Sequence, residues 1–212
     1  MEENIAILIA DLSGYTALTE THGSSSAADM IDKYIEMVKK SLVGDCHLHS
    51  QTGDEVVIVS SSPDYLMATA VLLILNASSE NNFLQVHGGM HFGKILKRND
   101  NYFGTTINLA SRIASKASPG TFWCSMDYLN ALEKKSSFTF QSKGKHSFKN
   151  LSDENEVWEL VIADPTGFHI DPVCRMLITE NEQAVPHPHE EGVFFCSVNC
   201  RDIYTKNNKL EA

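Results

Sequence analysis

The chain begins with a run of apolar and β-branched residues, Ile5 to Ala10, which predicts a strand buried on both faces. The run ends at a carboxylate, Asp11, and Ser13-Gly14 break the strand before a helix-like stretch begins at Thr16. A charge at the mouth of a buried strand costs stability unless a cation meets it. A helix cap explains this stretch taken alone, but a second carboxylate, Asp54, lies beside another buried strand and weakens that explanation.

Helices and strands alternate irregularly after this first strand. Gly23 to Ser26 predict a loop, apolar residues recur at helical spacing from 27 to 43, and Thr52-Gly53-Asp54 predict the turn of a hairpin. Gly88-Gly89 are expected to allow close approach of another segment. We predict further helices over 65–78, 104–117 and 126–134, and strands over 46–51, 55–60, 84–92, 93–97, 122–125, 138–141 and 157–162. This pattern favours an α+β fold with helices packed on a mixed or antiparallel sheet.

Composition limits the classes of function. The chain has 212 residues, of which 42% are hydrophobic and 21% charged, so we expect one good-sized globular domain and a small addition. A net charge of −10 argues against non-specific nucleic-acid binding, but not against a nucleotide substrate. The apolar runs are too short to span a membrane, and the first one lacks a basic flank and meets Asp11 too early for a signal peptide. We therefore expect a cytoplasmic protein with no membrane partner, whose five cysteines are thiols or metal ligands.

The helix expected over 104–117 carries Asn108 and Arg112, which are four residues apart and share one face. Such a pair usually belongs to a solvated helix face. The functional interpretation is that the Arg holds a phosphate bidentately while the Asn orients a ribose.

Four sequence blocks, in order, resemble the signature blocks of class III nucleotidyl cyclases over roughly residues 1–163. They are Ile9 to Thr16, Gly53 to Val56, Gly104 to Arg112, and Phe148-Lys149-Asn150 followed by Val157 to Leu160. The resemblance implies a ferredoxin-like α+β core that acts as a head-to-tail homodimer. It also implies conversion of ATP or GTP to a 3′,5′-cyclic nucleotide and pyrophosphate.

The same resemblance assigns roles to individual residues. Asp11 and Asp54, with the Leu12 backbone carbonyl nearby, match the ligands of two Mg²⁺ or Mn²⁺ ions, which prefer oxygen ligands. Asn108 and Arg112 match the pair that the partner subunit supplies to the ribose and the α-phosphate. The triphosphate-binding lysine matches Lys149, with Lys143 and Lys145 as its rivals.

The positions that select the base depart from the family pattern. Ser50 occupies the usual Lys position and Asn101 the usual Asp position, so neither the adenine pair nor the guanine pair of Glu and Cys is present. Asn150 also replaces a customary Gly. The choice between ATP and GTP therefore stays open. The alternative function is a catalytically degenerate cyclase-homology domain that binds nucleotide or dimerises within a metal or redox sensor, and a third is a structural dimer with an inert zinc clip.

A turn-rich stretch, Asp164 to Gly167, predicts a boundary, and residues 168–212 beyond it resemble a YHS domain, a small TRASH-type, treble-clef-like module. Its Asp-Pro-Val-Cys and Phe-Cys-x-x-x-Cys motifs contribute Cys174, Cys196 and Cys200. Three thiolates suit one Zn²⁺ or Cu⁺ ion, which would stabilise so short a segment and could regulate the cyclase. Either His187 or His189 could be a fourth ligand, whereas the remaining cysteines, Cys46 and Cys124, are expected in the core.

Overall fold

A mixed β-sheet forms the body of the protein, with strands in the order β2-β3-β1-β4-β6-β8-β7. The computed structural model describes residues 2–99, 101–148, 154–162, 169–174, 176–178 and 184–209. Neighbouring strands of this order pair antiparallel except β4 and β6, which are parallel. The strands are β1 Glu2–Ser13, β2 His47–Thr52, β3 Glu55–Ser60, β4 Phe83–Arg98, β6 Phe122–Ser125, β7 Thr139–Ser147 and β8 Glu154–Val161, with the short β5 Asn101–Phe103 paired to β4.

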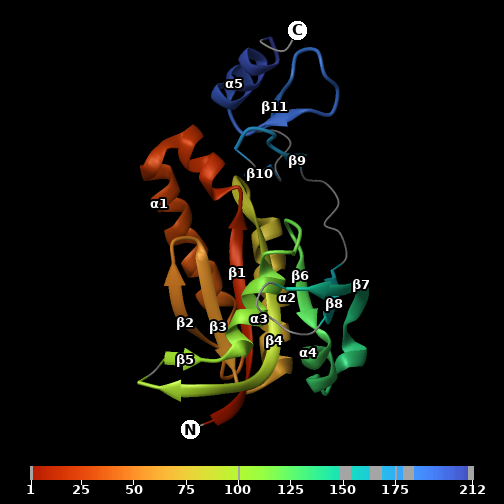
Figure 1. Ribbon diagram of the computed structural model, residues 1–212. Coiled ribbons are helices and arrows are strands. Elements are labelled where there is room, and N and C mark those ends of the chain that lie inside the picture. The colour runs from red at the N-terminus through yellow and green to blue at the C-terminus, as the bar shows by residue number, and fades with distance from the viewer. Residues whose placement is uncertain are drawn as a thin grey trace.

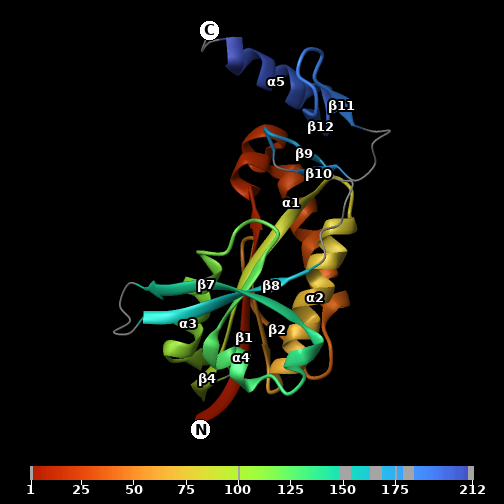
Figure 2. The same ribbon diagram turned by 90° about the vertical axis from the view of Figure 1, so that its right-hand side faces the viewer.

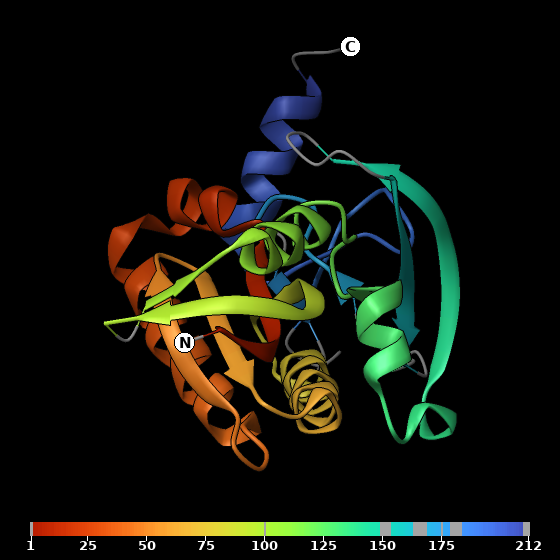
Figure 3. The same ribbon diagram turned by 60° about the horizontal axis from the view of Figure 1, so that its bottom comes forward.

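The central strand β1 is buried on both faces, as its continuous apolar run predicts (Figure 1). Its odd-numbered residues, Ile5, Ile7 and Ile9, pack in the cluster that includes α3 Thr105–Ala114. Its even-numbered residues pack with the helices of the other face, which are α1 Tyr15–Ser41, α2 Pro63–Ser79 and α4 Met126–Ala131. Figure 3 shows α3 over one face of the sheet and α1 and α2 against the other. The expected α+β fold, with helices packed on a mixed sheet, is therefore confirmed.

Two sequence-based element boundaries are wrong. The expected loop at 23–26 is part of α1, where only Gly23 leaves helical geometry, with φ 83° and ψ 168°. One residue in that conformation is enough to kink a helix, and the serines that follow resume it. The two strands expected over 84–92 and 93–97 are one strand, β4, because Gly93 stays in register opposite Ile5.

The paired glycines of β4 allow close contacts, as expected. A Cβ atom on Gly89 would lie 2.4 Å from the Ala110 carbonyl oxygen and 2.2 Å from the Ala114 nitrogen of α3. A Cβ on Gly88 would lie 2.6 Å from the backbone oxygen of Ile9. All three contacts at Gly89 are with backbone atoms of α3, whereas Gly88 also faces the Phe122 side chain. The fit of α3 against the sheet therefore requires the absence of a side chain at Gly89.

A small C-terminal module follows the sheet and docks on one end of it (Figures 1 and 2). It contains β9 His169–Ile170, β10 Met176–Ile178, β11 Val185–Pro186, β12 Phe194–Phe195 and α5 Val198–Lys209. Met176 of β10 pairs with Leu84, at the beginning of β4. Asp11 pairs with His87 a few residues further along β4, so the module joins the end of the sheet that carries Asp11. The expected boundary at 164–167 lies outside the described residues.

The core also accounts for the two remaining cysteines, since Cys46 and Cys124 are buried in the main hydrophobic cluster.

Within the described ranges, no helix is both long and apolar enough to cross a membrane.

Replacing Gly89 with Ala should destabilise the fold strongly, because α3 must move away from β4. We expect a loss of about 3 kcal/mol in the free energy of unfolding, at the upper end of typical overpacking costs. The control is Gly144→Ala, where φ is 83° but nothing lies within 4 Å of the new Cβ. It should cost only about 1 kcal/mol through backbone strain. Equal losses in urea unfolding would contradict the close fit of α3.

Candidate active site and a cysteine–histidine cluster

Two carboxylates meet at one end of the sheet. Asp11 follows the buried part of β1, and Asp54 sits in the β2–β3 turn beside Gly53, whose φ of 62° is left-handed. The register that pairs Ala10 with Val56 brings the two Asp side chains into hydrogen-bonding contact. The Leu12 backbone N–H donates to Asp11 Oδ1 over 3.0 Å. Strand pairing thus brings together two residues that are far apart in the sequence.

The carboxylate pair is short of positive charge. Burial raises the pKa of Asp11, while burial together with the Asp11 carboxyl raises the pKa of Asp54 to about 6. Two half-buried carboxylates this close cannot both ionise cheaply unless a cation lies between them. Oxygen ligands of this kind suit Mg²⁺ or Mn²⁺, so the residues present fit the divalent ions that the resemblance implies.

Three further residues surround the pair and were not identified from the sequence. His87 lies opposite Asp11, and its Nδ1 is 2.9 Å from Ser13 Oγ. Burial lowers the pKa of His87, although the nearby Asp54 carboxyl opposes this. The hydroxyl of Tyr34 is fully buried without a hydrogen-bond partner among the described residues, and burial and the Asp11 and Asp54 charges raise its pKa. Only the pairing of β1 with β4 could have indicated His87.

Asn108 and Arg112 lie on the exposed face of α3, while Leu109 and Ile113 on its other face are buried beside Trp123. Within the described part of the chain, no hydrogen bond or ion pair joins Asn108 or Arg112 to the aspartates. The helix therefore presents an amide and a guanidinium to the outside. Within the described residues of one chain, the carboxylate pair and the amide–guanidinium pair are therefore separate groups.

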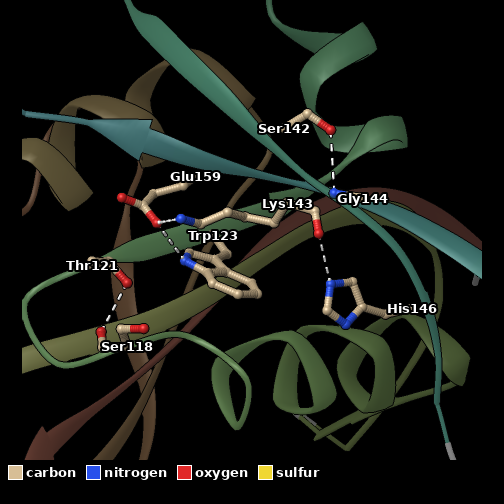
Figure 4. Close-up of polar contacts among 8 residues, drawn as sticks. All are labelled: Ser118, Thr121, Trp123, Ser142, Lys143, Gly144, His146 and Glu159. Carbon is tan, nitrogen blue, oxygen red and sulfur yellow. Dashed lines mark hydrogen bonds and ion pairs between the residues drawn. The ribbon is translucent and has the colours of Figure 1, made fainter.

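The three candidate triphosphate-binding lysines differ in their surroundings. Lys149 lies outside the described residues. Lys143 forms an ion pair of 2.6 Å with Glu159, which also accepts a hydrogen bond of 3.1 Å from Trp123 Nε1 (Figure 4). Its ammonium lies 5.4 Å from the centre of the Trp123 ring. The charge of Lys143 is thus balanced at the β7–β8 edge, whereas Lys145 is exposed.

The two positions expected to read the base, Ser50 and Asn101, are both exposed. The Asn101 side-chain amide donates to the Asn99 carbonyl over 3.1 Å. The neighbours of these two residues in the sequence, His49 and Tyr102, are in contact, with ring centres 4.6 Å apart. Both rings line a cavity of about 280 Å³. Ser50 and Asn101 are both neutral, and neither is among the residues that line this cavity, which are His47, Leu48, His49, Lys97 and Tyr102.

The three tail cysteines converge, and a histidine from the body of the protein joins them. The ligand atoms of His22, Cys174, Cys196 and Cys200 all lie within 4.8 Å of one another. No pattern in the tail could have indicated His22, which lies in α1. The two expected alternatives are not in this cluster: His187 packs against Phe195 and Tyr204 with its Nδ1 3.5 Å from a Glu190 carboxylate oxygen, and His189 is exposed.

Hydrogen bonds order the cluster. The fully buried Asp171 carboxylate accepts from the backbone N–H groups of Val173, Cys174 and Cys196, at 2.8, 3.2 and 2.8 Å. Contacts with Cys174 and Cys196 lower the pKa of Cys200. Contacts with Cys196 and Cys200, together with burial, raise the pKa of Cys174. Of the three cysteines, Cys200 is thus the one whose surroundings favour the thiolate, the form that binds metals.

Residues 1–161 match the family described as the adenylate and guanylate cyclase catalytic domain. The chain belongs to this family. An adenylate cyclase of Glutamicibacter nicotianae is 26% identical over 167 residues, which cover 78% of this chain and 41% of that protein. An uncharacterized protein of Mycobacterium tuberculosis is 37% identical over 112 residues, covering 52% of this chain and 30% of that protein. The chain thus spans less than half the length of these two relatives.

Solved cyclases share the fold. An adenylate cyclase structure from Trypanosoma brucei superimposes with a TM-score of 0.72 at 20% identity, covering 78% of this chain and 91% of that one. The adenylyl cyclase CyaB from P. aeruginosa gives a TM-score of 0.65 at 16% identity, covering 78% of this chain and 97% of that one. At these identities the likeness shows the fold alone.

In the absence of divalent ions, Asp54→Asn should stabilise the protein at neutral pH. The raised pKa of Asp54, about 6, means that the folded state holds a proton that the unfolded state loses near pH 4. Its stabilising effect is complete below about pH 4 and is lost as pH rises through about 6. The substitution should therefore raise the melting temperature at pH 7.5 and change it little at pH 4.

Asp45→Asn is the control of opposite sign. Hydrogen bonds from Ser60 and Ser61 outweigh burial and lower the pKa of Asp45, so its contribution is present at neutral pH and lost as pH falls. Removing that carboxylate should lower stability at pH 7.5. A pH-independent effect of Asp54→Asn would contradict the carboxylate pair.

Proposed function

We propose that the chain is a nucleotidyl cyclase that converts a nucleoside triphosphate to a 3′,5′-cyclic nucleotide and pyrophosphate. The observation that carries the proposal is the hydrogen-bonded pair of Asp11 and Asp54 at the end of β1, in a chain of the cyclase family. In this reaction the ribose 3′-oxygen attacks the α-phosphorus, a new P–O bond forms, and the bond to the β-phosphate oxygen breaks. Pyrophosphate leaves with the electron pair of that bond.

Asp11, Asp54 and the Leu12 carbonyl would hold two Mg²⁺ or Mn²⁺ ions, which when bound supply positive charge to the triphosphate and acidify the 3′-hydroxyl. The two carboxylates place negative oxygens at the end of the sheet, where burial and the neighbouring Asp11 carboxyl raise the pKa of Asp54. A cation bound there would offset this cost of ionisation. Asn108 would orient the ribose through its amide. Arg112, always protonated, would stabilise the charge that develops at the α-phosphate.

The carboxylate pair and the Asn108–Arg112 pair lie apart in one chain, and this separation supports catalysis by a head-to-tail homodimer. The carboxylate pair and the exposed face of α3 share no contact within the described ranges of one chain. A second chain could present its Asn108 and Arg112 to the first chain's aspartates. Lys149 is the proposed third group of this set, and the ion pair of Lys143 with Glu159 disfavours Lys143 for that role.

The identity of the base is less constrained. Relatives named adenylate cyclases favour ATP, whereas the neutral side chains of Ser50 and Asn101 match neither usual base-selecting pair. These same residues favour the second candidate function, a nucleotide-binding or dimerising cyclase-homology domain without turnover. Both ATP and GTP therefore need to be tested.

We further propose that residues 168–212 form a YHS-like module in which Cys174, Cys196 and Cys200 bind one Zn²⁺ or Cu⁺ ion. The sulfur–sulfur distances of 3.5 and 3.7 Å at Cys196 support this proposal. A metal or redox change at this module would regulate the cyclase only if the two cyclase states bind the metal with different affinities.

Purified protein should form cyclic nucleotide from ATP or GTP when Mn²⁺ is present. Asp54→Asn should reduce kcat at least about 100-fold, because loss of a metal-binding carboxylate removes charge stabilisation in the transition state. Product is measured by chromatography. Asp45→Asn, which removes a carboxylate outside the site, should retain activity. No product with either nucleotide, from a dimer that binds both, would favour the second candidate.

Mixing two inactive variants should restore activity if the site is shared. Asp54→Ala lacks the carboxylate half and Arg112→Ala lacks the guanidinium half, so each heterodimer would contain one intact site and one doubly defective site. We expect up to about a quarter of wild-type activity in an equimolar mixture with random exchange of chains, since half of the dimers would carry one site of two. An inactive mixture with heterodimers shown by mass spectrometry would rule out the shared site.

A further inference from the structure

We propose that His22 of the cyclase body is the fourth ligand of the tail metal, so that one ion clamps the C-terminal module onto α1. This inference rests on the proposed metal binding by the tail cysteines and adds a ligand from outside the tail. His22 Nε2 lies 3.4 Å from Cys200 Sγ and 3.8 Å from Cys196 Sγ. Its sequence separation from these residues is 178 and 174.

The spacing of the four ligand atoms matches a tetrahedron around zinc. With Zn–S bonds of about 2.3 Å and Zn–N bonds of about 2.0 Å, tetrahedral angles place two sulfurs about 3.8 Å apart and a sulfur and a nitrogen about 3.5 Å apart. The sulfur pairs Cys174–Cys196 and Cys196–Cys200 are 3.5 and 3.7 Å apart. The two nitrogen–sulfur distances of His22 lie on either side of the expected value. Four of the six distances among these atoms therefore fit a tetrahedral zinc centre, and the other two, from Cys174 to Cys200 and to His22, are at most 4.8 Å.

The local structure of α1 explains how His22 reaches the tail. Gly23, directly after it, leaves helical geometry with φ 83°, and a side chain at this φ would be strained. The first segment of α1 therefore ends at the cluster, and Figures 1 and 2 show the kinked end of α1 beside the tail. His22 is half-buried. The kink is thus the feature that turns a helix of the cyclase body toward the cysteines.

Two other contacts fix the cysteines in position. The buried Asp171 carboxylate holds the backbone at Cys174 and Cys196 together, which is the outer support that metal ligands usually have. The pairing of Met176 with Leu84 attaches the same segment to β4. Cys174 is thereby held beside the body of the protein, where His22 can share its metal.

A metal clamp at His22 would also affect the end of the sheet that carries Asp11. The segment of α1 that ends at His22 begins at Tyr15, directly after Asp11, Leu12 and the Gly14 turn. Metal binding would immobilise this segment at both ends, whereas a metal-free tail would release its far end. The tail and the proposed active site would then share one short piece of helix.

The test compares wild-type full-length protein with His22→Ala and the control His189→Ala, which removes an exposed tail histidine outside the cluster. Each protein is stripped of metal under reducing conditions and titrated with Co²⁺ and then Zn²⁺ in excess Mg²⁺, which occupies oxygen ligands. Thiolate-to-Co²⁺ absorption reports the tail site. We expect one ion per chain in wild type and control, and a Zn²⁺ affinity at least about 10- to 100-fold weaker in His22→Ala, with a changed cobalt spectrum.

Hydrogen exchange of the wild type and of His22→Ala gives a second measurement. Zn²⁺ should protect residues 15–30 as well as residues 171–200. In His22→Ala, protection should remain only in the tail. If wild type binds no metal and its three thiols react freely, the proposed tail site itself is wrong. If His22→Ala binds Zn²⁺ with unchanged affinity and spectrum, and Zn²⁺ leaves residues 15–30 of wild type unprotected, the tail site stands and the clamp is wrong.

Discussion

The burial of β1 on both faces is the constraint on which the rest of the structure depends. A strand covered by helices on either side needs apolar residues at consecutive positions, and Ile5 to Ala10 supply them. Its odd-numbered residues hold α3, and its even-numbered residues hold α1 and α2. A slip of one residue in register would exchange these two sets, so the position of Asp11 at the end of the strand is fixed by packing far from it.

The fixed position of Asp11 brings two partly buried carboxylates together, and the proposed chemistry relies on this concentration of negative charge. Pairing of β1 with β3 places Asp54 against Asp11, and burial makes their joint ionisation costly. Within the part of the chain that the structure describes, no ion pair joins either carboxylate to a Lys or Arg, and burial lowers the pKa of the neighbouring His87. A divalent cation and a partner chain would supply what one chain lacks. The same reasoning connects the exposed Asn108 and Arg112 to a role outside their own subunit.

Local patterns in the sequence were enough for much of this arrangement. The apolar run of β1, the glycine of the β2–β3 turn and the four-residue spacing on α3 each predict their structure from neighbouring residues. The predictions failed where the decisive contact is distant. Gly23 is the exception, because its break is local and the helix resumes directly after it. The continuity of β4 through Gly93 depends on pairing with β1. His87 and His22 acquire their surroundings from strands and cysteines more than 70 residues away, as the separations of 74 for Ser13–His87 and 178 for His22–Cys200 show.

The central claim is that one catalytic site combines groups from two chains, and a crystal structure with Mn²⁺ and a non-reactive ATP analogue tests it most directly. The account predicts metal ions between the phosphates and Asp11 and Asp54 of one chain, with Asn108 and Arg112 of the other chain at the ribose and α-phosphate. A nucleotide bound away from the aspartates, or one contacted by Arg112 of the same chain, would contradict it.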